Sequence, residues 1–146
     1  MVEKMFSRRR TRSVQLGSIA IGGDNPVSVQ SMTTTKTSDV TATVAQIAAL
    51  QTAGCEIVRL AIPDMAAAMA VSSIKEASAV PLVADIHFDY RLALEVISRG
   101  IDALRLNPGN IKDGEQVRSV VRAAQAKRIP IRIGVNAGSL DGAMLE

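Results

Sequence analysis

The sequence predicts an α/β protein and, within that class, a partial TIM (β/α) barrel: about five of eight parallel strands with a preceding N-terminal hairpin. Short apolar runs alternate with amphipathic stretches, and the expected strands start at about residues 27, 57, 82, 103 and 131. A period of roughly 20 to 30 residues is typical of βα units. In addition, one row of each strand is apolar, whereas the other row turns polar towards the carboxyl end. Helices on both faces of a doubly wound sheet would leave no room for those polar side chains, but a barrel mouth has that room.

The N-terminal residues predict a leader followed by a hairpin. We assign residues 1–13 to a basic leader and residues 14–146 to the N-terminal part of a (β/α)8 barrel. Val14–Leu16 and Ile19–Ile21 flank Gly17-Ser18, a pair that is typical of a two-residue turn. The expected hairpin therefore precedes the first strand of the main sheet.

Five strands and four intervening helices are expected after the hairpin. We place the strands at residues 27–32, 56–62, 82–86, 103–106 and 131–135. A residue that can cap a helix N-terminus precedes each helix: Asp39 (or Thr37 or Ser38), Asp64, Asp89 and Asp113. The buried stripes are expected to contain Val40, Val44, Ile47 and Leu50 in the first helix, Met65, Met69 and Ile74 in the second, Leu92, Ala93, Val96 and Ile97 in the third, and Val117, Val120, Val121 and Ala124 in the fourth.

Composition restricts the class of protein and its partners. With 47% hydrophobic and 2% aromatic residues, the core must be aliphatic, and no apolar run approaches the roughly 18 residues of a membrane span. The net charge of +3 arises largely from arginines in the leader. We interpret the leader as a solvated segment, with a nucleic-acid or acidic-lipid tail as the alternative, because almost no aromatic residues are available for base stacking. We therefore expect a cytoplasmic protein with no membrane and no nucleic-acid partner.

Cysteine usage restricts the cofactors. Cys55 is the single cysteine, which excludes a disulfide framework and, within this chain, an iron–sulfur or structural zinc site. Cys55 lies at the start of an expected strand, so we interpret it as a small core residue. We expect this chain by itself to bind no metal and no cofactor.

Alternation along the strands selects the candidate site residues. Because side chains alternate between the two faces of a strand, the row opposite the apolar one must face the barrel interior. We expect the barrel mouth to be lined by Gln30, Arg59, Asp85, His87, Arg105, Asn107, Arg132 and Asn136. Three arginines with two asparagines and one carboxylate predict a site for an anion, since the planar guanidinium matches phosphate oxygens in pairs. The alternative is a buried network in which each arginine pairs with a carboxylate.

Asp85 and His87 are the candidate catalytic pair. Alternate carboxylate and imidazole side chains on a strand can share a metal ion, but no third ligand follows nearby and arginines surround the pair. We favour binding of substrate hydroxyl groups or proton transfer by the two groups. A third alternative is that His87 is only a hydrogen-bonded residue of the mouth.

Five motifs together resemble one enzyme family. The stretches PVSVQSMTTTKTSDV, EIVRLAIP, PLVADIHFDYRLAL, ALRLNPGNI and IRIGVNAGSL, in this order and spacing, resemble the N-terminal part of the 4-hydroxy-3-methylbut-2-enyl diphosphate synthase family (IspG/GcpE). The resemblance implies a barrel that binds 2-C-methyl-D-erythritol 2,4-cyclodiphosphate, in an oxidoreductase of the methylerythritol phosphate route to isoprenoids. It also implies a homodimer in which a C-terminal domain with a [4Fe–4S] cluster caps the barrel mouth of the partner subunit, with ferredoxin or flavodoxin as electron donor.

The resemblance also implies roles for individual residues. Arg59, Arg105, Asn107, Arg132 and Asn136 match diphosphate ligands of the family, and Asp85 and His87 match polar residues beside the substrate.

The chain departs from the family in its length, because it ends after the fifth of eight strands and lacks the cluster cysteines. We therefore expect it to be inactive alone. Its open sheet edges also predict self-association or loose packing. Two other functions stay open: a non-catalytic (di)phosphate-binding fragment and a pterin-type barrel transferase.

Overall fold

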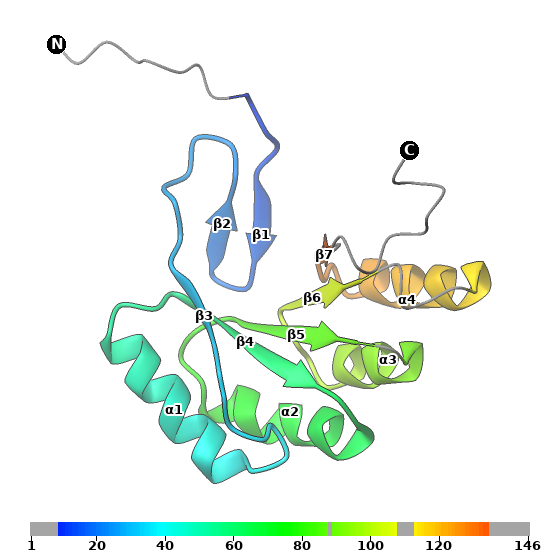
Figure 1. Cartoon of the computed structure of the whole chain (residues 1–146). Coiled ribbons are helices and arrows are strands. Elements are labelled where there is room, and N and C mark those ends of the chain that lie inside the picture. Colours follow the sequence, from blue (N-terminus) through cyan, green and yellow to red (C-terminus); the bar gives the residue numbers. More distant parts are fainter. Residues whose placement is uncertain (1–8, 88, 108–112, 135–146) are drawn as a thin grey trace, which may run out of the picture.

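The computed structural model describes residues 9–87, 89–107 and 113–134. In chain order the elements are β1 (Val14–Leu16), β2 (Ile19–Ile21), β3 (Gln30–Met32), α1 (Val40–Thr52), β4 (Ile57–Ile62), α2 (Met65–Ala77), β5 (Leu82–Ile86), α3 (Tyr90–Ser98), β6 (Ala103–Leu106), α4 (Gly114–Ala126) and β7 (Ile131–Ile133). The predicted α/β class, with a parallel sheet after an antiparallel hairpin, is confirmed (Figure 1).

The main sheet has the strand order of a barrel. Its five strands are all parallel and lie side by side in chain order, β3-β4-β5-β6-β7. The helices lie along one face of this sheet, while the hairpin stands apart from them at the other side (Figure 1). A doubly wound sheet would reverse its strand order and carry helices on both faces. The arrangement is therefore part of a (β/α) barrel.

The four helices of the described residues begin at the predicted aspartate caps. The Asp39 and Asp64 carboxylates accept hydrogen bonds from the N–H groups of Ala42 and Ala67, and those of Asp89 and Asp113 accept from Arg91 and Glu115. Each cap satisfies one backbone donor that the first helical turn leaves without a partner.

The main core lies between the helices and the sheet, and it corrects two expected stripes. Met65 and Met69 are exposed, whereas Ala67, Ala68, Val71 and Ile74 are the buried face of α2. The small alanines let the helix approach the sheet closely, so the long methionines point outward. In α4, Val120 and Ala124 are buried but Val121 is exposed. The predicted stripe of α3 is correct.

A second, smaller core closes the amino-terminal end of the sheet. Leu16 and Ile19 of the hairpin pack on Ile57, Val83 and Ala103, which are the first interior residues of three neighbouring strands. The turn between β1 and β2 needs glycine, because Gly17 has φ +56° and a Cβ there would lie 2.9 Å from Pro81. The hairpin is thus a plug on the side opposite the carboxyl ends of the strands.

The described end of the leader is tied to this plug. The Thr11 hydroxyl accepts a hydrogen bond from the Gly23 N–H at 2.9 Å, and the Ser13 hydroxyl accepts one from the Asn25 side chain at 3.0 Å. These contacts place residues 11–13 against the turn that follows β2. The boundary between leader and barrel at residue 13 stays a prediction.

Strand β3 is shorter than expected because a side chain interrupts its ladder. The Val29 N–H donates to the Glu56 carboxylate at 2.8 Å, while the Val29 carbonyl accepts from the N–H groups of both Glu56 and Ile57. Regular pairing with β4 therefore begins only at Gln30. The predicted strand at 131–135 is observed as Ile131–Ile133, and Val135 lies outside the described residues.

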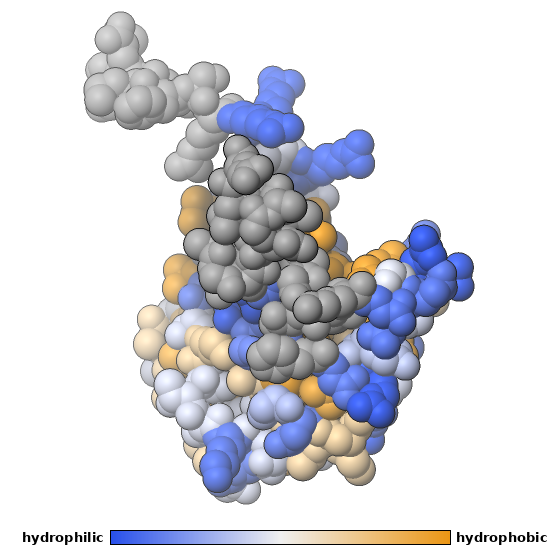
Figure 2. All heavy atoms as spheres, turned by 45° about the vertical axis from the view of Figure 1, so that its right-hand side comes forward, coloured by the Kyte–Doolittle hydropathy of each residue, from blue (hydrophilic) through white to orange (hydrophobic). Residues whose placement is uncertain are grey.

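The surface carries apolar side chains beside both outer strands of the sheet. Val27 and Val29 before β3 and Ile133 in β7 are exposed. Figure 2 shows that the hydrophobic surface is divided into several small patches among hydrophilic side chains. Self-association through these edges stays a prediction. None of the helices within the described ranges has the length and hydropathy needed to cross a lipid bilayer.

Candidate anion-binding site at the strand ends

The strand register brings three predicted site residues to one level of the sheet. Asp85 is the partner of Arg105, and Arg105 is the partner of Arg132, on the adjacent strands β5, β6 and β7. Arg59 lies one interior step lower, in register with Val83. Because the strands are parallel, these side chains meet at the same end of the sheet, where the carboxyl ends of the strands lie. The interior row that alternation predicted is therefore observed for these residues.

Asp85 is the centre of this cluster. Its side chain is 1% exposed, and each carboxylate oxygen accepts a hydrogen bond from a different arginine. The Arg59 Nη2 donates to Oδ2 at 2.6 Å, and the Arg105 Nη1 donates to Oδ1 at 3.1 Å. A buried carboxylate needs such partners, since transfer of an unpaired charge out of water is very unfavourable. The single carboxylate of Asp85 thus pairs with two guanidinium groups, and the cluster has an excess of positive charge.

Both arginines keep donors for a further acceptor. Arg105 uses Nη1 for Asp85 and Nη2 for the Gly134 carbonyl, at 3.2 Å. The Arg59 Nε is buried and has no hydrogen-bond partner among the described residues. Buried donors are normally satisfied, so this one indicates a water molecule or a ligand.

His87 and Asn107 lie at the ends of the same strands. The His87 Nε2 is 3.8 Å from the Asp85 Oδ2, and the His87 side chain is 42% exposed. Asn107 follows β6 directly and is buried. Asn136, also predicted as a ligand, lies outside the described residues.

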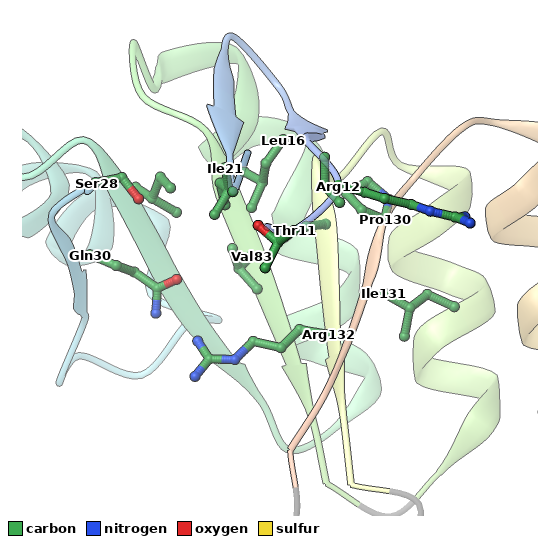
Figure 3. Close-up of a pocket in the computed structure, with 14 residues that line it drawn as sticks. Thr11, Arg12, Leu16, Ile21, Ser28, Gln30, Val83, Pro130, Ile131 and Arg132 are labelled. Atoms are coloured by element: carbon green, nitrogen blue, oxygen red, sulfur yellow. The ribbon is translucent and has the colours of Figure 1, made fainter. Parts of the chain in front are cut away.

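Arg132 and Gln30 lie on the open side of the sheet. Both line a cavity of about 520 Å³ between the hairpin and the interior face of the strands. The Arg132 side chain extends from β7 across the sheet, towards the side on which Gln30 lies (Figure 3). Arg132 is exposed, and no carboxylate of the described residues forms an ion pair with it. Gln30 is in register with Ile57, below the level of Asp85, so the structure does not bring it to the carboxylate cluster.

The loop after β3 is fixed at the same end of the sheet by contacts that the sequence reasoning missed. The Thr37 hydroxyl donates to the Ala61 carbonyl at 2.6 Å. The Gln46 side chain of α1 accepts hydrogen bonds from the N–H groups of Thr34 and Thr35. A run of threonines before a helix cap was the available signal, because hydroxyl groups often bond to nearby backbone.

Gly134 is another residue of the site that the sequence reasoning did not select. It follows β7 directly, on the same side as Arg132, and its carbonyl accepts a hydrogen bond from Arg105. A glycine that immediately follows a short strand often marks a place where another group approaches the backbone closely. The sequence therefore contained a signal for it.

The described residues contain no cluster suited to a metal ion. No three His, Cys, Asp or Glu side chains gather among them. Cys55 is buried at the amino-terminal end of β4, and its thiol lies 3.0 Å from the Ile57 carbonyl oxygen. Cys55 precedes β4, whereas Asp85 lies near the carboxyl end of the adjacent strand β5, so the two residues lie at opposite ends of the sheet.

Pairing at the start of α3 shifts the pKa values of Asp89 and Arg91. The hydrogen bonds that the Arg91 side chain and backbone donate to Asp89 lower the pKa of that carboxyl group. The same pairing raises the pKa of Arg91. Asp89 is thus held as a carboxylate at the helix N-terminus, where negative charge is favourable.

A comparison with protein families finds one match over nearly the whole chain. Residues 11–146 match the family described as "GcpE TIM-barrel domain". This match includes every residue of the candidate site.

Relatives of known name share more than half of their residues with this chain over the matched region. The chain is 60% identical over 136 residues to a protein of Dehalococcoides mccartyi and 58% identical over 146 residues to one of Listeria monocytogenes. These matches cover 93% and 100% of this chain, respectively. Both relatives are named 4-hydroxy-3-methylbut-2-en-1-yl diphosphate synthase (flavodoxin). The chain spans 39% of the length of each.

Solved structures share the fold at low sequence identity. Dihydropteroate synthase of Yersinia pestis superposes with a TM-score of 0.59 at 14% identity, covering 83% of this chain and 45% of that protein. N-acetylmannosamine-6-phosphate 2-epimerase of Clostridium perfringens gives a TM-score of 0.51 at 15% identity, covering 75% of this chain and 51% of that protein. These similarities concern the fold alone.

Proposed function

The chain belongs to the GcpE TIM-barrel domain family, and we propose that it forms the N-terminal, substrate-binding part of a 4-hydroxy-3-methylbut-2-enyl diphosphate synthase. The proposed substrate is 2-C-methyl-D-erythritol 2,4-cyclodiphosphate. In the proposed reaction two electrons open the ring and one hydroxyl group leaves as water. Isoprenoid biosynthesis is the corresponding process.

The observation that carries this proposal is the excess of guanidinium groups at the strand ends. Two arginines share the buried Asp85 carboxylate, and Arg132 lies on the next strand. A diphosphate offers several acceptor oxygens and negative charge, which match the remaining N–H donors of Arg59 and Arg105. A neutral substrate would leave these donors without partners.

We assign different tasks to Asp85 and His87. Both oxygens of Asp85 are occupied by guanidinium groups, so its proposed role is to orient Arg59 and Arg105. His87 is partly exposed beside this cluster, and its imidazole is the group proposed to donate a proton to the departing hydroxyl. Asn107, at the end of β6, is proposed as a further ligand of the diphosphate.

We propose that the whole protein uses an iron–sulfur cluster whose ligands lie outside this part of it. Such clusters need several thiolates, and the single cysteine of the chain is buried at the far end of β4. We propose that the remaining length seen in the relatives supplies those ligands. When bound, the cluster would supply electrons. The residues of this chain would bind the substrate, orient it and hold the proton.

Further partners and the location are proposed from the relatives. Flavodoxin appears in their names, and we propose it as the electron donor of the whole protein. We also propose a homodimer and a cytoplasmic location. A pterin transferase is not favoured, because the similarity to dihydropteroate synthase is one of fold at 14% identity.

A chimaera tests the proposed function in a protein of full length. This chain would replace the 146 matched residues of the Listeria monocytogenes relative, which are 58% identical to it. We expect the purified chimaera, with reduced flavodoxin, to convert the cyclic diphosphate, and we expect Arg59→Ala in the chimaera to abolish most of this activity.

The unaltered relative is the control for the rest of the molecule. The proposal is wrong if the chimaera is folded, has the same metal content as the control, and still gives no product. Equal activity of the Arg59→Ala chimaera would remove Arg59 from the site.

A further inference from the structure

We propose that Gly134 is a positioning residue for Arg105, which holds the guanidinium in the orientation that an anion requires. The inference rests on the proposed function, because it adds a residue to the same site. Gly134 itself need not touch the substrate. It acts through its carbonyl and through the space that its missing side chain leaves.

Two contacts fix the Arg105 guanidinium at its two ends. Its Nη1 donates to the Asp85 Oδ1 at 3.1 Å, and its Nη2 donates to the Gly134 carbonyl at 3.2 Å. The Arg105 side chain is only 12% exposed. A guanidinium has five N–H donors, so three of them have no acceptor among the described residues. Because the group is planar and rigid, fixing two donors also fixes its plane and the direction of each remaining donor.

The close approach depends on the absence of a Cβ. A Cβ built on Gly134 would lie 2.8 Å from the Arg105 Nε and 3.1 Å from its Nη2. A side-chain carbon and a nitrogen that is not bonded to it do not approach each other to 2.8 Å, so the guanidinium would have to move away. Its neighbour Arg132, by contrast, extends along the open side of the sheet (Figure 3).

Gly134 is not needed for its backbone conformation. Its φ lies outside the left-handed region that Gly17, Gly54 and Gly100 occupy. The Gly134 N–H donates to the Leu106 carbonyl at 3.0 Å, a bond that alanine also makes. Alanine is therefore compatible with the backbone at this position. The group that must move to make room for its Cβ is the flexible side chain of Arg105. Substitution should misplace that side chain without unfolding the chain.

The experiment compares Gly134→Ala with Gly114→Ala in the 146-residue chain. A Cβ at Gly114 meets no atom within 4 Å, which makes this variant a matched control. Calorimetric titration with the cyclic diphosphate is expected to give roughly ten-fold weaker binding for Gly134→Ala, the lower end of the loss expected for a charge-assisted hydrogen bond. The control is expected to bind as the unaltered chain does.

A double-mutant cycle separates positioning from a general structural effect. In the Arg105→Ala background, Gly134→Ala should have no further effect on the affinity, because the side chain that it displaces is gone. A general disturbance of β7 would weaken binding by the same factor in both backgrounds. That second outcome would overturn the inference.

A measurement without ligand keeps the inference testable if the unaltered chain does not bind. The side-chain Nε–H resonance of Arg105 is identified by NMR from its loss in Arg105→Ala. We expect this resonance to shift in Gly134→Ala and to stay in place in Gly114→Ala. An unchanged resonance in Gly134→Ala would overturn the inference, whereas a shift without any binding would leave it standing. The proposed function is tested separately, by the activity of the full-length chimaera.

Discussion

Replacing Asp85 with asparagine is expected to destabilise the chain by about 2–3 kcal/mol, because it weakens the two hydrogen bonds that Arg59 and Arg105 donate to the carboxylate. The carboxylate accepts one charge-assisted hydrogen bond from Arg59 and one from Arg105. Each such bond contributes roughly 1.5–3 kcal/mol. Asparagine keeps one acceptor oxygen, so one bond persists in a weaker form. Water reaches part of both arginines, whose side chains are 25% and 12% exposed, and this lowers the cost further.

Urea denaturation followed by circular dichroism measures this loss, since the chain has no tryptophan for fluorescence. Asp24→Asn is the control, because Asp24 is exposed in the turn after β2 and the substitution removes the same charge. We expect that variant to stay within about 0.5 kcal/mol of the unaltered chain.

Sulfate provides an independent readout of the same substitution. Without the carboxylate, two guanidinium groups lack a counter-ion, and an anion that binds the folded state stabilises it. We therefore expect sulfate to stabilise Asp85→Asn more than the unaltered chain. The reasoning is refuted if Asp85→Asn costs no more than Asp24→Asn, or if sulfate stabilises both chains equally.

Two further predictions concern the hairpin and a helix cap. Leu16→Ala should cost about 2–3 kcal/mol in urea denaturation, because Leu16 is buried against Ile57 and Val83 and its removal leaves a cavity in the smaller core; a loss below about 1 kcal/mol would mean that the hairpin does not act as a plug. Asp89→Ala should cost about 1 kcal/mol at neutral pH through loss of the α3 cap. Because the fold lowers the pKa of Asp89, its stabilisation is present above the unfolded value and is lost as the pH falls below about 4. The difference in unfolding free energy between the unaltered chain and Asp89→Ala should therefore shrink from pH 6 to pH 3. A constant difference would contradict the role of Asp89 as a charged helix cap.

Local chemistry explains which elements could be predicted from the sequence. The bounds of β5 and β6 agree with the prediction because turn residues or a helix end flank short apolar runs. The helix starts agree because a carboxylate precedes each one. The face of α2 was wrong because nearly all of its residues are apolar, so periodicity gives little contrast, and packing distance selected the small alanines.

The candidate site was predictable in part for a similar reason. Alternation alone places Arg59, Asp85 and Arg105 on the interior face, because period two is a property of any strand. Which arginine reaches which oxygen depends on the register between strands, and the sequence does not specify it. For the same reason Gln30 was grouped with the arginines, although it is in register with Ile57 at a lower level. The role of Gly134 depends on a distance between neighbouring strands.

The central claim is that the carboxyl ends of these strands already form a diphosphate site, and a calorimetric titration tests it most directly. The unaltered chain and Arg105→Ala would be titrated with the cyclic diphosphate, with inorganic sulfate as the control for unspecific anion binding. We expect saturable binding to the unaltered chain and a loss of about 1.5–3 kcal/mol in Arg105→Ala, the contribution of a hydrogen bond to a charged group. Equal affinity of the two chains, or no saturable binding to a chain shown to be folded, would contradict the claim.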